Sequence, residues 1–117
     1  MSRLKNLLYS YIYNPTLDNR LDLAEEYFAQ QQFAAALSYY LKIAEVSKDK
    51  NLQYYCLLRC AKCVEIPGNR KHSVITLYKH AISLLPKRPE AYYLLSKAYE
   101  MYNDWFDAYL FADLGLE

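Results

Sequence analysis

Small and apolar residues recur every 34 residues in the second half of the chain, and this period constrains the fold more than any other sequence feature. Val74, Tyr78, Ala81 and Ile82 are followed, 34 residues further on, by Ala108, Ala112, Gly115 and Leu116. A single helical hairpin cannot bury its apolar face, and it needs a neighbouring hairpin to cover that face. The period therefore predicts an array of stacked helix-turn-helix units.

The pattern reaches the first part of the chain, where it resembles the tetratricopeptide repeat. Leu23-Ala24, Tyr27, Phe33, Ala36 and Tyr40 correspond to Leu95-Ser96, Tyr99, Trp105, Ala108 and Ala112 in the last unit. The family has a large and a small apolar residue, then a tyrosine, in its first helix, and small residues around an aromatic one in its second. Pro86 falls at the family's inter-repeat proline, whereas Arg20, Ile43 and Val74 depart from its pattern. The resemblance covers residues 15–117 and implies an all-α, tetratricopeptide-like array of three antiparallel helical hairpins, a right-handed α-solenoid, behind an N-terminal helix.

We expect one tetratricopeptide-like domain over residues 1–117. Its expected parts are an N-terminal helix at 1–14, a first repeat at 15–50, a second repeat with a longer connection at 51–88, and a third repeat at 89–117. The expected helices cover 3–13, 15–31, 33–47, 52–65, 72–85, 89–102 and 104–116, with Asn14 capping the helix that Pro15 opens. Ala36 and Val74 are 38 residues apart. The second repeat therefore carries four surplus residues, in the connection after Ser47 and in the 65–70 loop.

Charge and hydropathy exclude several classes of function. The net charge is +1, without the strong basic excess that nucleic-acid binding requires, so we expect no nucleic-acid partner. Basic clusters at Arg70-Lys71-His72, Lys79-His80 and Lys87-Arg88 are typical of a solvated face, and phosphate binding is the alternative. The apolar runs are too short for a membrane span, and the N-terminus lacks the features of a signal peptide. We therefore expect a cytoplasmic protein with no membrane partner.

The sequence offers no set of residues suited to catalysis or metal binding. Cys56, Cys60 and Cys63 follow one stripe of a predicted helix, where thiols pack as small buried hydrophobes instead of converging on a zinc ion. Phosphate-binding glycine loops, nucleophile elbows and catalytic His constellations are missing from the sequence. We expect neither an enzyme nor a cofactor.

The resemblance implies a peptide-binding groove on the concave surface, which the first helix of each repeat lines. The predicted groove residues are Leu21, Glu25, Phe28, Tyr54, Leu57, Tyr93, Lys97, Glu100 and Met101. The register of the middle repeat is open by one or two residues. The family's readers of acidic chaperone tails use Lys and Asn where this chain has Leu21 and Glu25. We therefore expect a non-catalytic interaction scaffold that binds a mostly apolar peptide or helix of a protein partner.

Three further expectations concern the ends and context of the chain. The N-terminal stripe of Leu4, Leu7, Leu8, Tyr11 and Ile12 should pack on the first hairpin, with membrane-surface binding as the alternative. In the last helix, Tyr109, Phe111, Leu114 and Leu116 cannot all point inward, so we expect apolar surface to remain there. A next repeat, a downstream domain or a second copy of this chain could cover it, the last by self-association through this helix. The segment from Arg88 to Leu116 also resembles repeats attached to bacterial and phage glycosyltransferases. An accessory, positioning domain of a carbohydrate-modifying enzyme is therefore the alternative function.

Overall fold

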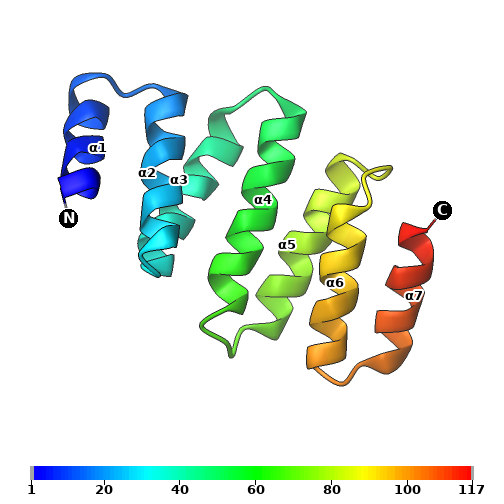
Figure 1. Ribbon diagram of the computed structural model, residues 1–117. Helices are drawn as coiled ribbons and strands as arrows, with labels where there is room; N and C mark the ends of the chain where they lie inside the picture. The colour runs from blue at the N-terminus through cyan, green and yellow to red at the C-terminus, as the bar shows by residue number, and fades with distance from the viewer. Residues whose placement is uncertain (1, 117) are drawn as a thin grey trace.

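The computed structural model describes residues 2–116, and within them the chain forms seven α-helices and no strand (Figure 1). The helices are α1 (Ser2–Tyr13), α2 (Leu17–Ala29), α3 (Phe33–Val46), α4 (Lys50–Glu65), α5 (Lys71–Leu84), α6 (Glu90–Met101) and α7 (Trp105–Gly115). Each helix packs mainly on the helices before and after it in the chain. The result is an elongated body of 49 × 28 × 18 Å, with α1 and α7 at opposite ends (Figure 1). None of the described helices is long and apolar enough to cross a bilayer.

The predicted helices all form, and the main differences lie at two N-termini. Thr16, and not Asn14, caps α2, where its hydroxyl accepts a hydrogen bond from the Asn19 amide at 3.1 Å. Asp49 caps α4 in the same manner, with a bond of 2.9 Å from the Asn51 amide. Thr and Asp are preferred caps because their oxygens satisfy amides that have no partner within the helix.

Small residues bring the two helices of a hairpin close together, as the repeat pattern predicts. Ala24 and Ala36 are fully buried in the first hairpin, and Ser96 and Ala108 occupy the same positions in the third. In the third hairpin the Ser96 hydroxyl donates a hydrogen bond of 2.8 Å to the Ala108 carbonyl. The bulky residue of the pattern follows on the second helix, where Tyr40 is fully buried. Close backbones and a large filler together give the dense packing that a helical array needs.

The turns of the first and third hairpins share one backbone conformation. Gln31 and Asn103 both lie in the left-handed region, with φ of 61° and 62°. In both turns, the amide of the following residue donates a 2.9 Å hydrogen bond to the tyrosine carbonyl of the first helix. The second hairpin turns differently, through Gly68 at φ 91° and Asn69 at φ 67°. Part of the surplus length of the second repeat therefore lies in this turn.

Helix α1 covers the open side of α2 and is held there by polar contacts as well as apolar ones. Leu4 is buried, and the Arg3 guanidinium binds the Glu26 carboxylate at 2.8 Å. Arg20 donates two hydrogen bonds to the Tyr11 hydroxyl, at 2.6 and 2.9 Å. Arg20, which departs from the repeat pattern, therefore serves here to anchor α1. Ile12 is 69% exposed, so the prediction that it packs on the hairpin is wrong, because it lies on the outer side of the helix.

Candidate peptide-binding surface

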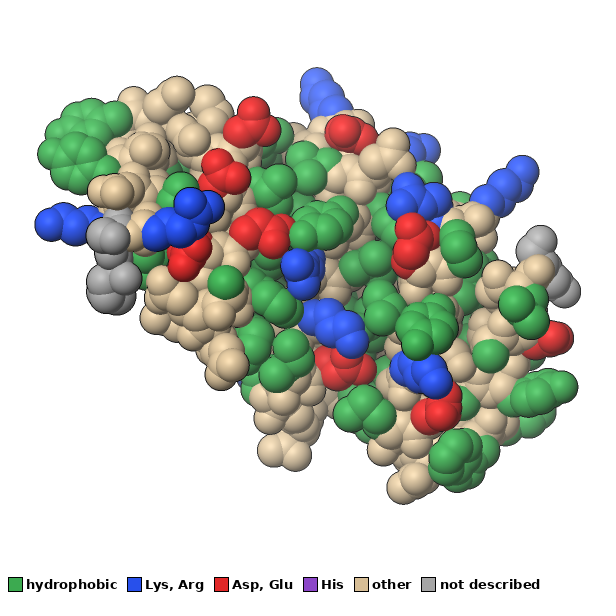
Figure 2. Space-filling view, viewed as in Figure 1, with side chains coloured by type: hydrophobic (Ala, Val, Ile, Leu, Met, Phe, Trp, Pro, Cys, Tyr) green, Lys and Arg blue, Asp and Glu red, His purple; other side chains and the backbone are tan. Residues whose placement is uncertain are grey.

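The first helices of the three hairpins, α2, α4 and α6, lie on one face of the array, and we call this face the first-helix surface. In Figure 1 these helices lie toward the viewer, and α3 and α5 lie behind them. Figure 2 shows that positive and negative side chains on this face neighbour one another, with hydrophobic side chains between them. Such a mixture suits a partner that is mostly apolar and carries a few charges.

Most of the predicted groove residues lie on this surface. Tyr93 and Met101 on α6 are 61% and 69% exposed, and Lys97 between them binds Glu100 at 3.4 Å. The ammonium of Lys97 also lies 5.6 Å from the centre of the Tyr93 ring. On α2, the predicted residues Leu21, Glu25 and Phe28 are half-buried. The third repeat therefore offers the larger exposed apolar area.

The prediction for the middle repeat is wrong by one residue. Tyr54 and Leu57 are buried, at 1% and 5% exposure, in a cluster with Ala81 and Ala91. Tyr55 is exposed on this side instead and Leu58 is half-buried, because one residue turns a helix by about 100°. The sequence contained the signal, since Cys60-Ala61 forms the large-small pair of the repeat once cysteine is counted as a packing residue.

A cluster of four side chains joins the first two repeats on this surface. The Tyr55 hydroxyl donates a 2.5 Å hydrogen bond to Glu25 and accepts one of 2.9 Å from the Nε of Arg59. The Arg59 guanidinium lies 4.4 Å from the centre of the Phe28 ring and 3.4 Å from the second Glu25 oxygen. A cation stacked on an aromatic face and paired with a carboxylate is held in one orientation. Sequence reasoning included Glu25 and Phe28 but missed Tyr55 and Arg59.

The Tyr55 hydroxyl of this cluster, and the hydroxyl of Tyr40 next to Phe28, stay protonated at neutral pH. Burial, and then the hydrogen bond to Glu25, raise the pKa of Tyr55 above its ordinary value. Burial and the nearby Glu25 carboxylate also raise the pKa of Tyr40, whose hydroxyl is buried without a hydrogen-bond partner among the described residues. A neutral tyrosine can donate a hydrogen bond, so Tyr55 supplies the donor and Arg59 the cation that face Glu25.

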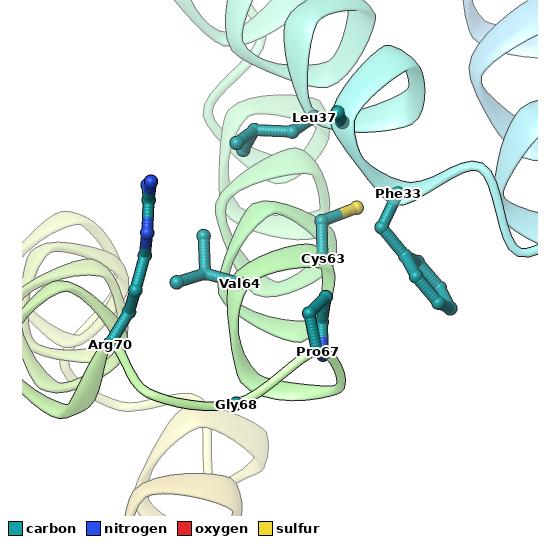
Figure 3. Close-up of a pocket in the computed structure, with 8 residues that line it drawn as sticks. Phe33, Leu37, Cys63, Val64, Pro67, Gly68 and Arg70 are labelled. Atoms are coloured by element: carbon teal, nitrogen blue, oxygen red, sulfur yellow. The ribbon is translucent and has the colours of Figure 1, made fainter.

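A hollow runs along the opposite side of the array between α3 and α5. It consists of three adjoining pockets of about 230, 400 and 330 Å³. The first and second share Leu37, Val64 and Arg70, and the second and third share Leu41 and Leu77. Figure 3 shows the first of these pockets, with Phe33 and Leu37 from α3 facing Cys63 and Val64 from α4 above the Pro67-Gly68 turn. Because Gly68 and its neighbours form one wall, the longer turn of the second hairpin shapes this hollow.

The three cysteines belong to the core, as the helical stripe predicted. Cys56, Cys60 and Cys63 are buried as free thiols against the first hairpin. Burial raises the pKa of Cys56 to about 12 and the pKa of Cys63 to about 11. Neutral thiols are poor nucleophiles and poor metal ligands. Among the described residues, His, Cys, Asp and Glu form no cluster of three that could hold a metal ion.

The stacked hairpins and the surface that their first helices form define a tetratricopeptide-type helical array. The solved structure of "MamA MSR-1 C2" is similar to this chain, with a TM-score of 0.76 and 19% identity over 96% of this chain and 63% of that one. A crystal structure of MamA is similar with a TM-score of 0.78 and 16% identity, over 97% and 64% of the two chains. MamA is a tetratricopeptide-repeat protein, and the likeness confirms the predicted fold. This chain spans less than two thirds of either structure. The sequence matches no protein-family model and no curated protein.

Proposed function

We propose that this chain is a non-catalytic scaffold that binds a peptide or helix of a protein partner on its first-helix surface. The observation that carries the proposal is the exposure of Tyr93 and Met101 beside the Lys97–Glu100 pair on α6. Aromatic side chains and methionine are enriched in the cores of interfaces, and charged pairs are typical of their rims. The tetratricopeptide-type fold supports the same proposal.

The chemistry of the surface sets the class of partner. A helix or extended segment would lay apolar side chains on Phe28, Tyr55 and Tyr93 and direct its few charges to Arg59 and Lys97. An acidic chaperone tail should bind weakly, because Glu25 stands where a reader of such tails needs a donor. A cytoplasmic location accords with this function and stays a prediction.

The alternative, an accessory domain of a carbohydrate-modifying enzyme, rests only on the sequence resemblance of its last repeat. Neither of the two similar structures supports it. The two proposals differ in their ligands, since the scaffold requires a polypeptide and the accessory domain requires an enzyme or its acceptor.

The proposal is tested by selecting binders from a displayed library of random peptides and measuring the affinity of a selected peptide by fluorescence anisotropy. Tyr93→Ala and Met101→Ala should each weaken its binding by about tenfold or more, as truncation of an interface anchor does. Thr76→Ala, on the exposed side of α5 at the hollow, is the matched control. Unchanged binding by both α6 variants, with a loss in Leu41→Glu, would assign binding to the α3–α5 hollow and overturn the proposed surface.

A further inference from the structure

Helix α7 exposes more large apolar side chains than α3 or α5. Trp105, Phe106, Tyr109 and Leu116 are 62%, 80%, 78% and 86% exposed, and Leu110 and Leu114 are more than a third exposed. Phe111 alone among the large residues of this helix stacks inward, 5.7 Å from the Tyr99 ring. Contiguous apolar surface of this kind marks an interaction site.

The repeat pattern does not account for all of this surface. Phe106 and Leu110 occupy the positions of Ala34 and Ser38 in α3 and of His72 and Thr76 in α5. The other two repeats therefore keep small or polar residues where α7 carries a second apolar stripe. This stripe lies beyond what one hairpin needs to pack on the next.

Helix α1, at the other end of the array, carries a matching surface. Tyr9, Ile12 and Tyr13 are 59%, 69% and 73% exposed, and Lys5 lies on the same side, one turn before Tyr9. The charged residues of α1 are Arg3 and Lys5, both basic, and Arg3 is paired with Glu26. Lys5 is therefore the cation that this exposed stripe offers.

The charges of α7 have the opposite sign. Its charged residues are Asp107 and Asp113, and no basic residue occurs between Trp105 and Gly115. Asp113 lies one turn after Tyr109, on the same side as the exposed aromatic residues, because side chains four apart share a helix face. Each end of the array thus presents apolar side chains with one charge at the edge, acidic on α7 and basic on α1.

We propose that copies of this chain associate head to tail, with α7 of one copy packed on α1 of the next. The two surfaces cannot meet within one molecule, because they lie at opposite ends of a body 49 Å long (Figure 1). Different patches in contact make a heterologous interface, which adds copies one after another. The assembly therefore grows with protein concentration.

The positions of the charges set the orientation. Lys5 lies near the start of α1 and Asp113 near the end of α7, so they meet when the two helices run antiparallel. That arrangement places Tyr9 over Tyr109 and brings Ile12 and Tyr13 to Phe106 and Trp105. With 150–250 Å² per large aromatic side chain, Trp105, Phe106 and Tyr109 together offer roughly 450–750 Å². A stable interface uses about 800 Å² on each partner, so the patch approaches the required area.

The experiment is sedimentation analysis of the whole chain over a range of concentrations. We expect the mean mass to rise with concentration, Tyr109→Glu to abolish the rise, and Lys5→Glu and Asp113→Lys each to weaken association by about tenfold. The chain that carries both charge reversals should regain association. Lys42→Glu, an exposed lysine on α3, is the matched control and should associate normally. A monomer at every concentration would overturn the proposal.

A mixing experiment separates this interface from a symmetric one. Ile12→Glu blocks α1 and Tyr109→Glu blocks α7, so each variant alone should be monomeric, and an equal mixture should form a 1:1 dimer through the two intact surfaces. If Ile12→Glu still dimerises by itself, α7 pairs with α7, and the head-to-tail proposal is wrong. Circular dichroism melts confirm that each variant is folded before it is mixed.

Discussion

The hydroxyl of Tyr54 accepts a hydrogen bond of 2.9 Å from the backbone amide of Ala91, so a side chain of the second hairpin caps the first helix of the third. Pro89 at the N-cap position of α6 gives no side-chain hydrogen bond of its own. The first amides of a helix have no partner within it, and a buried amide left unpaired costs free energy. Tyr54 is therefore a structural link between repeats.

Replacement of Tyr54 by Phe should lower the free energy of unfolding by about 1–3 kcal/mol, because it leaves the Ala91 amide buried and unpaired. The measurement is urea unfolding followed by circular dichroism. Tyr55→Phe is the adjacent control, since its hydroxyl lies on the surface and its loss should cost less. Equal losses in the two variants would contradict the capping role.

The substitution Gln31→Asn should stabilise the chain. Gln31 has a φ of 61°, a conformation that costs most side chains about 1–2 kcal/mol and that asparagine tolerates better. The third hairpin already has Asn103 at the equivalent position. We expect a melting temperature a few degrees higher in thermal unfolding. Gln31→Ala, which tolerates the left-handed backbone no better than glutamine, is the control at the same exposed site and should show no gain. A gain of equal size in that variant would remove the explanation.

Stability should fall at alkaline pH. Burial raises the pKa of the Cys56 and Cys63 thiols from 9.0 to about 12 and 11, and it also raises the pKa of Tyr78. The folded state holds these protons more tightly than the unfolded state, so this stability is complete below pH 9. It is then lost as the pH rises through the folded values, by up to about 1.4 kcal/mol per pH unit for each group.

Melting temperatures measured from pH 8 to pH 11 test this expectation. Cys63→Ala should flatten the decline, although it also lowers stability at pH 8 by opening a small cavity. The native thiols should react slowly with a thiol reagent until the chain is unfolded. Rapid reaction of the folded protein at pH 8 would show that the thiols are not buried.

Loss of the contact between Arg20 and Tyr11 should loosen α1 without unfolding the hairpins. Arg20→Gln removes two hydrogen bonds and a cation 5.3 Å from the Tyr11 ring. We expect faster amide hydrogen exchange in α1 and nearly unchanged exchange in α4. Arg70→Gln is the control, because Arg70 is exposed in a turn far from α1 along the array. Uniformly faster exchange in every helix would contradict a local role.

The periodic pattern was sufficient to predict the fold, because helical hairpins repeat the same small and bulky residues wherever they pack. The 34-residue interval between Val74 and Ala108 identified the second helices, and proline and polar residues marked most of their ends. The register of α4 was predicted wrongly by one residue, because its large-small pair is Cys60-Ala61 and cysteine is not the large apolar residue that this position has in the other two repeats.

The candidate site was less predictable than the fold. Spacing along the sequence determines which residues share one face of a helix, and this spacing predicted that Tyr93, Lys97 and Met101 lie together on α6. The cluster of Glu25, Tyr55 and Arg59 joins residues of two repeats, and its contacts depend on how one hairpin rotates against the next.

The neighbour-to-neighbour packing of the seven helices has a consequence for how the chain reaches its native state. Contacts that join segments close in sequence cost little loop-closure entropy, so folding is expected to be fast and to spread from whichever hairpin forms first. Under a pulling force applied to its ends, the same chain should extend one hairpin at a time. The protein would then extend and recoil stepwise, with Tyr54 and the Tyr55–Glu25 contact as the links between neighbouring hairpins.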